Sequence, residues 1–374
     1  MSRFVIAAAA VLLLLTMSLT QVKGATFREN AERYNAGALY DELPEEQKNA
    51  LGSLGVNGID PDELGSLSFD KILSSLGSSA VDNMAAPLRT LAAMLAVMLL
   101  YSLLYGLRTT AESSMSGALS LCTTLCVSCI AVVPMISMID SSSAVIKTMA
   151  DFMQSFVPII AVVIAASGHP AGGTAYYGFT IAASQIAVRV FSDFIVPFLR
   201  ILLAVSITTA VSTGVNLGGI IRSVSKFSKW ILGFIMTLFT AMLSFRQILA
   251  SGTDKLSDRA VRFALSGSVP IVGSALAEAY KTVQGSLDVL KSGIGVFAVI
   301  AVACVAAPAL ISCLCWMFSL WAAKSAGELM GLKEPCALLE SIEAVAGMFF
   351  AVMLSCACMF VISAALVLTI GGGG

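Results

Sequence analysis

Long apolar runs separated by short polar stretches fill the chain from residue 87 to residue 370. A helix that crosses a bilayer needs about 20 mostly apolar residues. Five runs reach that length: residues 87–107, 115–139, 230–249, 293–322 and 342–370. Helices and closed barrels are the structures that satisfy their own backbone hydrogen bonds in lipid, so these runs predict an all-α, polytopic membrane protein.

Three further apolar stretches do not fit one straight helix per span. Residues 179–221 are too long for a single span, and they form either two helices that meet near Pro197 or one long kinked helix. The sequence leaves both readings open. Residues 156–167 and 263–279 fall below spanning length and are predicted to be re-entrant or interfacial. The total is six to eight spans.

The overall composition agrees with a membrane protein. Hydrophobic residues make up 57% of the chain and charged residues 12%, against about half and a quarter in soluble domains. The mean hydropathy is +0.90. A water-soluble fold of this size could not bury so much apolar surface, so bilayer lipid is an expected partner.

The first 24 residues have the three parts of a secretory signal. Arg3 precedes an apolar run at residues 4–15, and small and polar residues then lead to a cleavage position after residue 24. An uncleaved N-terminal anchor is the alternative. The expected organisation is a signal peptide at 1–24, an exported segment at 25–86 and a polytopic helical membrane domain at 87–370.

The expected exported segment, residues 25–86, is soluble in character. It holds eleven acidic and four basic residues, a net charge of −7. Negative charge repels phosphate groups, so neither nucleic acid nor anionic lipid is expected to bind it. Proline and carboxylates at residues 43–48 and 60–64 are typical of helix starts. A segment of about 60 residues is barely large enough to fold alone, so it should pack against the membrane domain or a partner.

Basic residues set the expected orientation, because Lys and Arg collect on the cytoplasmic side of membrane proteins. Arg222, Lys226 and Lys229 have no acidic residue among them and are predicted to be cytoplasmic. Counting spans from there puts residues 324–343 inside, and the acidic segment and the tail at 371–374 outside.

A short string of residues occurs twice. Val-Pro-Ile at 157–159 recurs at 269–271, and each copy is followed at a similar distance by a proline in an apolar run. The pattern predicts parallel repeats at 115–221 and 230–322; chance recurrence in an apolar chain is the alternative. Four prolines are the candidate helix breaks: Pro158, Pro197, Pro270 and Pro308.

The chain lacks the common catalytic motifs. It contains no G-x-x-x-x-G-K-[ST], no H-E-x-x-H and no G-x-S-x-G, so no enzyme activity is predicted. Cys122, Cys126 and Cys129 share a helix face, but small Cys side chains pack in membrane helices much as Ser or Ala does. His169 has no companion at ligand spacing and lies in a predicted turn. No cofactor and no metal site is therefore predicted.

Charged residues within the apolar region are the candidate functional residues, since charge at membrane depth is costly and faces a bundle interior or a water-filled cavity. Arg189 and Asp193 are four positions apart and could neutralise each other on one helix face. The alternative is that the charged side chains are interfacial and extend to the headgroups. The full set is Arg189, Asp193, Arg200, Glu278 and Lys281.

Several sequence blocks together resemble one family. They are Leu-Pro-Glu-Glu-Gln-Lys at 43–48, Ser-Val-Pro-Ile-Val-Gly at 268–273, Val-Gln-Gly-Ser-Leu at 283–287 and Lys-Ser-Gly-Ile-Gly-Val at 291–296. With the signal and the polytopic domain, they resemble the stage III sporulation protein AE family of endospore-forming bacteria. The likeness covers essentially the whole chain and is most specific at 252–296.

The resemblance implies a place and partners. Members of this family belong to the complex that links mother cell and forespore, and sit in the mother-cell membrane around the forespore. The implied partners are an ATPase and ring-forming proteins of the same operon, and a forespore-side channel protein, in a hetero-oligomeric complex. The family has no accepted catalytic residues to carry over.

Three functions remain open. The chain could be a permease-like or gating part of a channel, which the repeat and the charged residues favour. It could be a structural platform for ring assembly, which small packing residues such as Gly117, Ala118 and Ser120 favour. An independent secondary transporter would need a coupling-ion site, for which Asp193 is the one candidate.

Overall fold

The computed structural model describes residues 24–60, 63–64, 69–106, 113–211 and 273–369, with scattered positions between 223 and 241. In this part of the chain the regular elements are helices, as the sequence predicts. Three short helices come first: α2 (Gly24–Arg33), α3 (Ala38–Asp41) and α4 (Glu45–Ser53). The long elements are α6 (Phe69–Gly106), α7 (Ser113–Ala166), α8 (Pro170–Arg189), the π-helical η1 (Val190–Ile195), α9 (Val196–Val211), α11 (Gly273–Leu329) and α12 (Lys333–Thr369).

Two tight turns fold the long helices back on one another. Each turn contains a glycine with positive φ, Gly168 at 92° and Gly331 at 74°. The next residues, His169 and Leu332, donate their backbone N–H to carbonyls five positions back, at 3.2 and 3.0 Å. This is the Schellman motif, in which a glycine in the left-handed region ends a helix because it has no Cβ. The turns produce two antiparallel pairs, α7–α8 and α11–α12.

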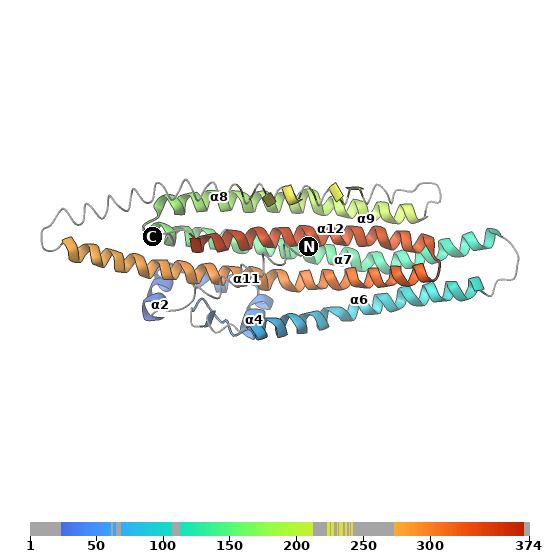
Figure 1. Cartoon of the computed structure of the whole chain (residues 1–374), viewed down its shortest axis with the longest axis horizontal. Helices are drawn as coiled ribbons and strands as arrows, with labels where there is room; N and C mark the ends of the chain where they lie inside the picture. The colour runs from blue at the N-terminus through green and yellow to red at the C-terminus, as the bar shows by residue number, and fades with distance from the viewer. Residues whose placement is uncertain are drawn as a thin grey trace.

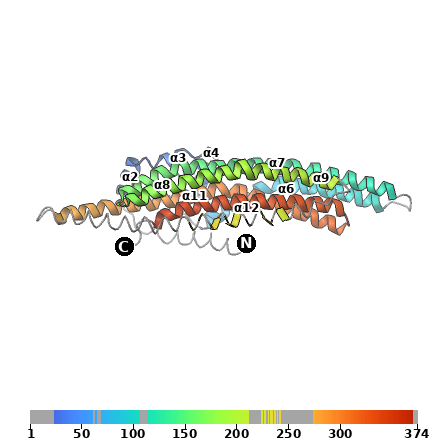
Figure 2. The same cartoon turned by 90° about the horizontal axis from the view of Figure 1, so that it is seen from above.

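The long helices lie side by side in an elongated bundle (Figures 1 and 2). The α11–α12 hairpin is central: α11 packs against α6 and α7, and α12 packs against α7 and α9. Large side chains, among them Phe297, Phe349 and Met353, are fully buried between these helices. Packing of apolar helix faces therefore holds the bundle together.

Hydrogen bonds between helices set how neighbouring helices are aligned along the length of the bundle. On α11, the Ser319 hydroxyl donates to the Pro87 carbonyl of α6 at 2.9 Å. On α8, the Tyr176 hydroxyl donates to the Ser363 carbonyl of α12, also at 2.9 Å. Both bonds are buried, so each satisfies polar atoms that would otherwise cost free energy in an apolar interior.

Four of the described helices contain stretches long and apolar enough to cross a membrane: Asn83–Leu104, Ala118–Ala166, Thr282–Leu329 and Lys333–Leu368. The predicted spans 87–107, 115–139, 293–322 and 342–370 each coincide with one of them. The expectation of six to eight spans includes residues 230–249 and 263–279, which lie largely outside the described residues. Residues 1–23 and residues 242–272 of the second expected repeat, Pro270 among them, also lie outside them.

The expected break between 115–139 and 156–167 is wrong, because α7 runs unbroken from Ser113 to Ala166. The polar stretch between them is one face of an amphipathic helix. Asp140, Lys147 and Asp151 are exposed, while Ile146 and Phe152 are buried. A spacing of seven and then four residues puts the three charges on one side of the helix.

The prolines expected to break helices do not end them. Pro158 lies inside α7 and Pro308 inside α11. Proline removes one hydrogen bond, but neighbouring helices and local adjustment allow a packed apolar helix to continue through it.

Residues 170–211 form one uninterrupted helical run with a local irregularity, which supports the interpretation as one long helix over this range. The irregularity is η1, directly before Pro197. The Val196 N–H donates to the Phe191 carbonyl five positions back, which is the π-helical pattern. Widening the turn ahead of Pro197 lets the helix continue where proline would clash with the regular turn.

The acidic segment packs against the bundle, as its small size predicts. Phe27 of α2 contacts α11 at Gly293, where a Cβ would be 2.7 Å from the aromatic ring. The rings of Tyr40 and Phe297 are 6.5 Å apart. The expected boundary between residues 86 and 87 falls inside the continuous helix α6.

Candidate functional site: charged contacts along the bundle

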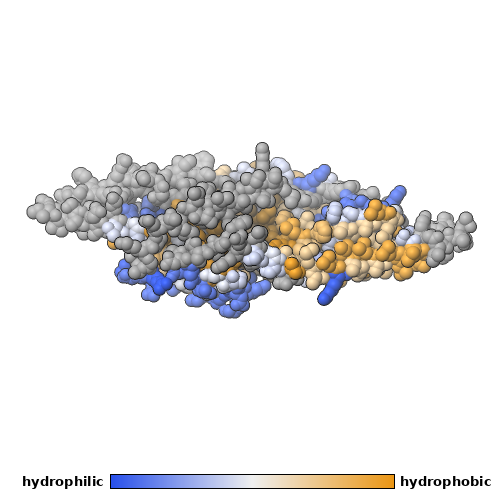
Figure 3. All heavy atoms as spheres, turned by 60° about the horizontal axis from the view of Figure 1, so that its bottom comes forward, coloured by the Kyte–Doolittle hydropathy of each residue, from blue (hydrophilic) through white to orange (hydrophobic). Residues whose placement is uncertain are grey.

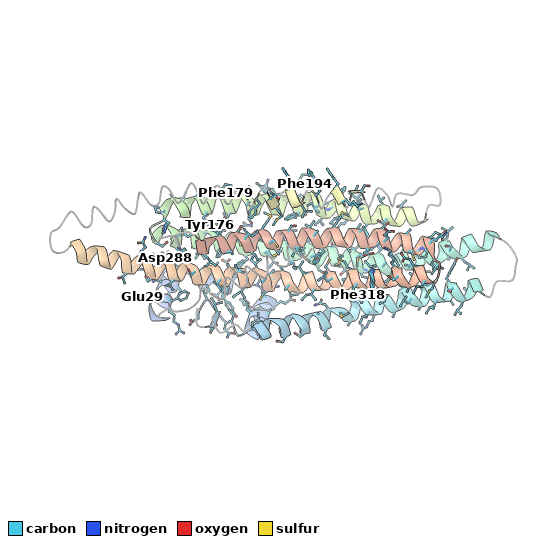
Figure 4. All side chains as sticks on the ribbon, viewed as in Figure 1. Glu29, Tyr176, Phe179, Phe194, Asp288 and Phe318 are labelled. Carbon is cyan, nitrogen blue, oxygen red and sulfur yellow. The ribbon has the colours of Figure 1, made fainter. Side chains whose placement is uncertain are left out.

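Arg189 and Asp193 do not form the expected ion pair. Arg189 is the last residue of α8, Asp193 lies in η1, and both side chains are exposed. The ion pairs found among the described residues do not include either one. Figure 4 shows this segment at the edge of the bundle, with Phe194 on its outer side.

Arg200 instead binds Asp140, in the polar stretch between the apolar runs 115–139 and 156–167. Its guanidinium on α9 forms a salt bridge with the Asp140 carboxylate on α7. The two side chains are 52% and 53% exposed, so water can reach the pair. The contact joins two helices at the point where the apolar first half of α7 ends.

A second group of polar contacts surrounds the α11–α12 hairpin. The Ser120 hydroxyl of α7 donates to the Glu334 carboxylate in the first turn of α12. Lys324 of α11 and Glu343 of α12 form an ion pair of 3.8 Å, with side chains 23% and 26% exposed. These contacts tie three helices together near one end of the bundle, and the set of candidate residues taken from the sequence did not include them.

Lys291 is the most buried charged side chain in the described part of the chain, with 3% of its side chain exposed. Its ammonium group lies 2.6 Å from the Asp288 carboxylate one turn earlier on α11. Nearby, the Asn30 amide of α2 donates to the Ser286 hydroxyl at 3.3 Å. In Figure 4, Asp288 on α11 lies close to α2, which carries Glu29. The buried lysine therefore lies where the acidic segment meets the bundle.

Glu278 and Lys281 fall in the first turns of α11. The structure describes their backbone as helical and gives no placement for their side chains.

The comparisons with known proteins agree with one another. The family model of stage III sporulation protein AE matches residues 61–371. The chain belongs to the stage III sporulation protein AE family. A curated relative, stage III sporulation protein AE of Bacillus subtilis (strain 168), is 21% identical over 233 residues, which is 62% of this chain and 58% of the relative. No solved structure matches.

The family match starts after α4, so it covers the bundle from α6 to α12 but not α2 to α4. Within the match, the block at 291–296 has a packing role. Lys291 is buried, and at Gly295 a Cβ would meet the Leu368 side chain of α12 at 3.1 Å. Residues 291–296, at the end of the most specific part of the resemblance, are thus where α11 packs closely against both α2 and α12.

The cysteines are free thiols. Cys122, Cys126 and Cys129 are exposed on α7, whereas Cys313, Cys336 and Cys356 are buried. Cys313 approaches the Ala346 carbonyl at 3.8 Å across the α11–α12 interface. Among the described residues, no three His, Cys, Asp or Glu side chains are grouped as metal ligands.

Proposed function

We propose that this chain is the multi-pass membrane component of a channel-like complex that connects mother cell and forespore and is needed for spore development. Its family supplies the sporulation role. The observation that carries the proposal is that charged contacts join separate helices of the bundle, as Arg200–Asp140 and Lys324–Glu343 do. Charges that hold apolar helices together at defined levels suit a rigid membrane component rather than a lipid-anchored tether.

The proposed location is the mother-cell membrane that surrounds the forespore, with the acidic segment in the space between the two membranes. Two features support this orientation. The predicted export signal precedes the acidic segment, and Arg222, Lys226 and Lys229 are predicted to lie on the opposite side. The proposed partners are the ATPase and ring-forming proteins of the same operon and a forespore-side channel protein.

A structural platform for ring assembly is the second candidate function. Fully buried side chains such as Phe156, Phe297 and Phe349 fill the middle of the bundle in the described part of the chain. A bundle with a filled core offers a solid support, and a conducting path would then have to lie between this chain and its partners. A secondary transporter has less support, because Asp193 is an exposed surface residue.

The test is a gene deletion in the spore-former that encodes this chain, complemented by a tagged copy. We expect deletion to reduce heat-resistant spores sharply, and the tagged chain to surround the forespore and to purify with the ATPase. A normal spore count after deletion would contradict the proposal. The double variant Lys324→Met with Glu343→Leu separates the two functions: full partner binding with few spores favours the channel, and full partner binding with normal spores favours the platform.

A further inference from the structure

The helices of the bundle are too long to lie wholly within one bilayer. α7 has 54 residues, about 81 Å at 1.5 Å per residue. The hydrocarbon core is about 30 Å thick, and the whole bilayer with its headgroups about 40–45 Å. A tilt of about 40°, the upper end of the usual range, would still leave α7 about 62 Å tall. A large part of the bundle must therefore stand outside the membrane.

Exposed apolar side chains show which part is embedded. Most of the large ones gather toward the end of the bundle formed by α6, the first half of α7, α9 and the α11–α12 turn. Figure 3 shows an orange surface at this end of the bundle on the face in view. We name these residues the apolar belt: Val81, Leu88, Leu99, Leu100, Leu103, Leu104, Leu125, Val133, Ile136, Phe194, Phe198, Ile201, Leu314, Phe318, Trp321 and Leu329.

The height of the belt matches a bilayer. On α6 it extends from Val81 to Leu104, about 35 Å of helix. Contacts between α11 and α6 place the α11 members at the same level. Ser319 meets Pro87 of α6, and Gly327 lies against Met98 of α6, whose sulfur would be 3.3 Å from a Cβ at that glycine.

The opposite half of the bundle is built like a water-soluble protein. We name it the stalk: residues 140–166 of α7, α8, residues 273–297 of α11, and α2 to α4. Its interior holds fully buried apolar side chains such as Phe156 and Ile160. Its surface carries Asp151, Gln154 and Gln185, and it also carries the acidic segment, seen as blue in Figure 3.

Few large apolar side chains are exposed on the stalk. They are Val162, Tyr177, Ile186 and Val283. Isolated exposed apolar residues are normal on soluble surfaces, whereas many of them spread over about 35 Å of α6 and over the neighbouring α7, α9 and α11 are not. The two ends of one bundle thus face two different solvents.

We propose that lipid acyl chains cover the apolar belt and that the stalk projects into water on the side of the membrane that holds the acidic segment. The border lies near the Arg200–Asp140 salt bridge, where charge first appears on the outer face of α7. Residues 156–166 are then apolar because they pack in the core of the stalk, not because they contact lipid. This inference depends on the bundle alone and holds for either proposed function.

Two valines on α7 provide a matched test. Val133, in the belt, is 69% exposed and Val162, in the stalk, is 56% exposed. In a cysteine-free chain in native membranes, a water-soluble maleimide supplied to both faces should react with Val162→Cys at least an order of magnitude faster than with Val133→Cys. Equal rates after denaturation in detergent are the control. Equally slow reaction in membranes, or faster reaction at Val133→Cys, would overturn the proposal.

A second pair of variants does not need the cysteine-free chain. Val133→Arg places a charge against lipid and should lower the membrane level of the protein several-fold, while Val162→Arg should leave it unchanged. Val133→Leu and Val162→Leu are the controls for size. Equal losses from the two arginines would contradict the stalk. Spore counts are not used, so failure here is distinct from failure of the proposed function.

Discussion

The two halves of α7 are both apolar in sequence, yet their outer faces differ. The first half exposes Leu125, Val133 and Ile136, whereas the second exposes Asp140, Lys147 and Asp151. The inner faces of both halves are buried among apolar side chains. Hydropathy averaged along a helix counts inward and outward residues together, so it cannot distinguish a lipid-facing helix from one that packs into its own core. The outer face identifies the surrounding solvent.

The largest effect on stability is expected from a substitution that disturbs helix packing in the stalk. At Gly173 of α8, a Cβ would lie 2.6 Å from the Ala161 carbonyl oxygen of α7, while at Gly178 it would meet nothing within 4 Å. Gly173→Ala should destabilise the protein by about 1–3 kcal/mol, because backbone must move. Gly178→Ala should be neutral or stabilising by up to about 1 kcal/mol, because alanine favours helix. Thermal unfolding in detergent compares them; equal midpoints would mean that α7 and α8 are not closely packed.

The Lys324–Glu343 ion pair, in the belt half, should contribute more to stability than the Arg200–Asp140 pair at the border. Glu343→Leu leaves Lys324 without its partner at membrane depth, and we expect a cost of about 2 kcal/mol, since an unpaired charge at a span centre costs about 2.5–3.5 kcal/mol and this one is partly exposed. The double change Lys324→Met with Glu343→Leu should restore the protein level, measured by immunoblot of membranes. No recovery would show that the hairpin needs the charges themselves.

The Arg200–Asp140 pair at the border should contribute less to the free energy of unfolding. Asp140 and Arg200 are about half exposed, and exposed ion pairs are worth about 0–1 kcal/mol. Asp140→Asn and Arg200→Gln should each shift the unfolding midpoint slightly, and the double variant should add little more. A double-mutant cycle measures the coupling. A coupling above about 2 kcal/mol would place the pair in a drier environment than the border of the belt.

The smallest effect is expected at Arg189 and Asp193. Both are exposed and unpaired with each other, so Arg189→Gln and Asp193→Asn should leave the protein level unchanged, alone or combined. Spore counts of the same strains separate structure from function. A loss of spores at a normal protein level would return these residues to the mechanism, as a surface for a partner.

Much of the fold follows from the sequence, because the apolar run 156–167 ends at the turn that contains Gly168, and the runs 293–322 and 342–370 lie on either side of Gly331. The course of α7 could also have been found, since Asp140, Lys147 and Asp151 recur at helical spacing without a glycine or proline among them. The π turn at 190–195 could not be deduced, because it depends on how α8 and α9 pack against neighbouring helices.

The candidate site was less predictable. Ser120 and Glu334 are 214 positions apart, and Arg200 and Asp140 are 60 apart. A single sequence records which charges exist but not which helices adjoin. Arg189 and Asp193 are close in sequence, whereas the Arg200–Asp140 and Lys324–Glu343 pairs join different helices. Lys291 lies within a block that the sequence singles out, but its burial depends on packing between elements far apart in the sequence.

The most direct test of the two-solvent bundle is an image of the purified chain in a lipid nanodisc. The disc should surround α6 from about residue 81 to residue 104, together with the α11–α12 turn. The α7–α8 turn and the acidic helices should project beyond one face of the disc by about 40 Å, the length of residues 140–166 of α7. A disc centred on α8, with the belt outside it, would contradict the division of the bundle into a lipid-covered belt and a water-exposed stalk.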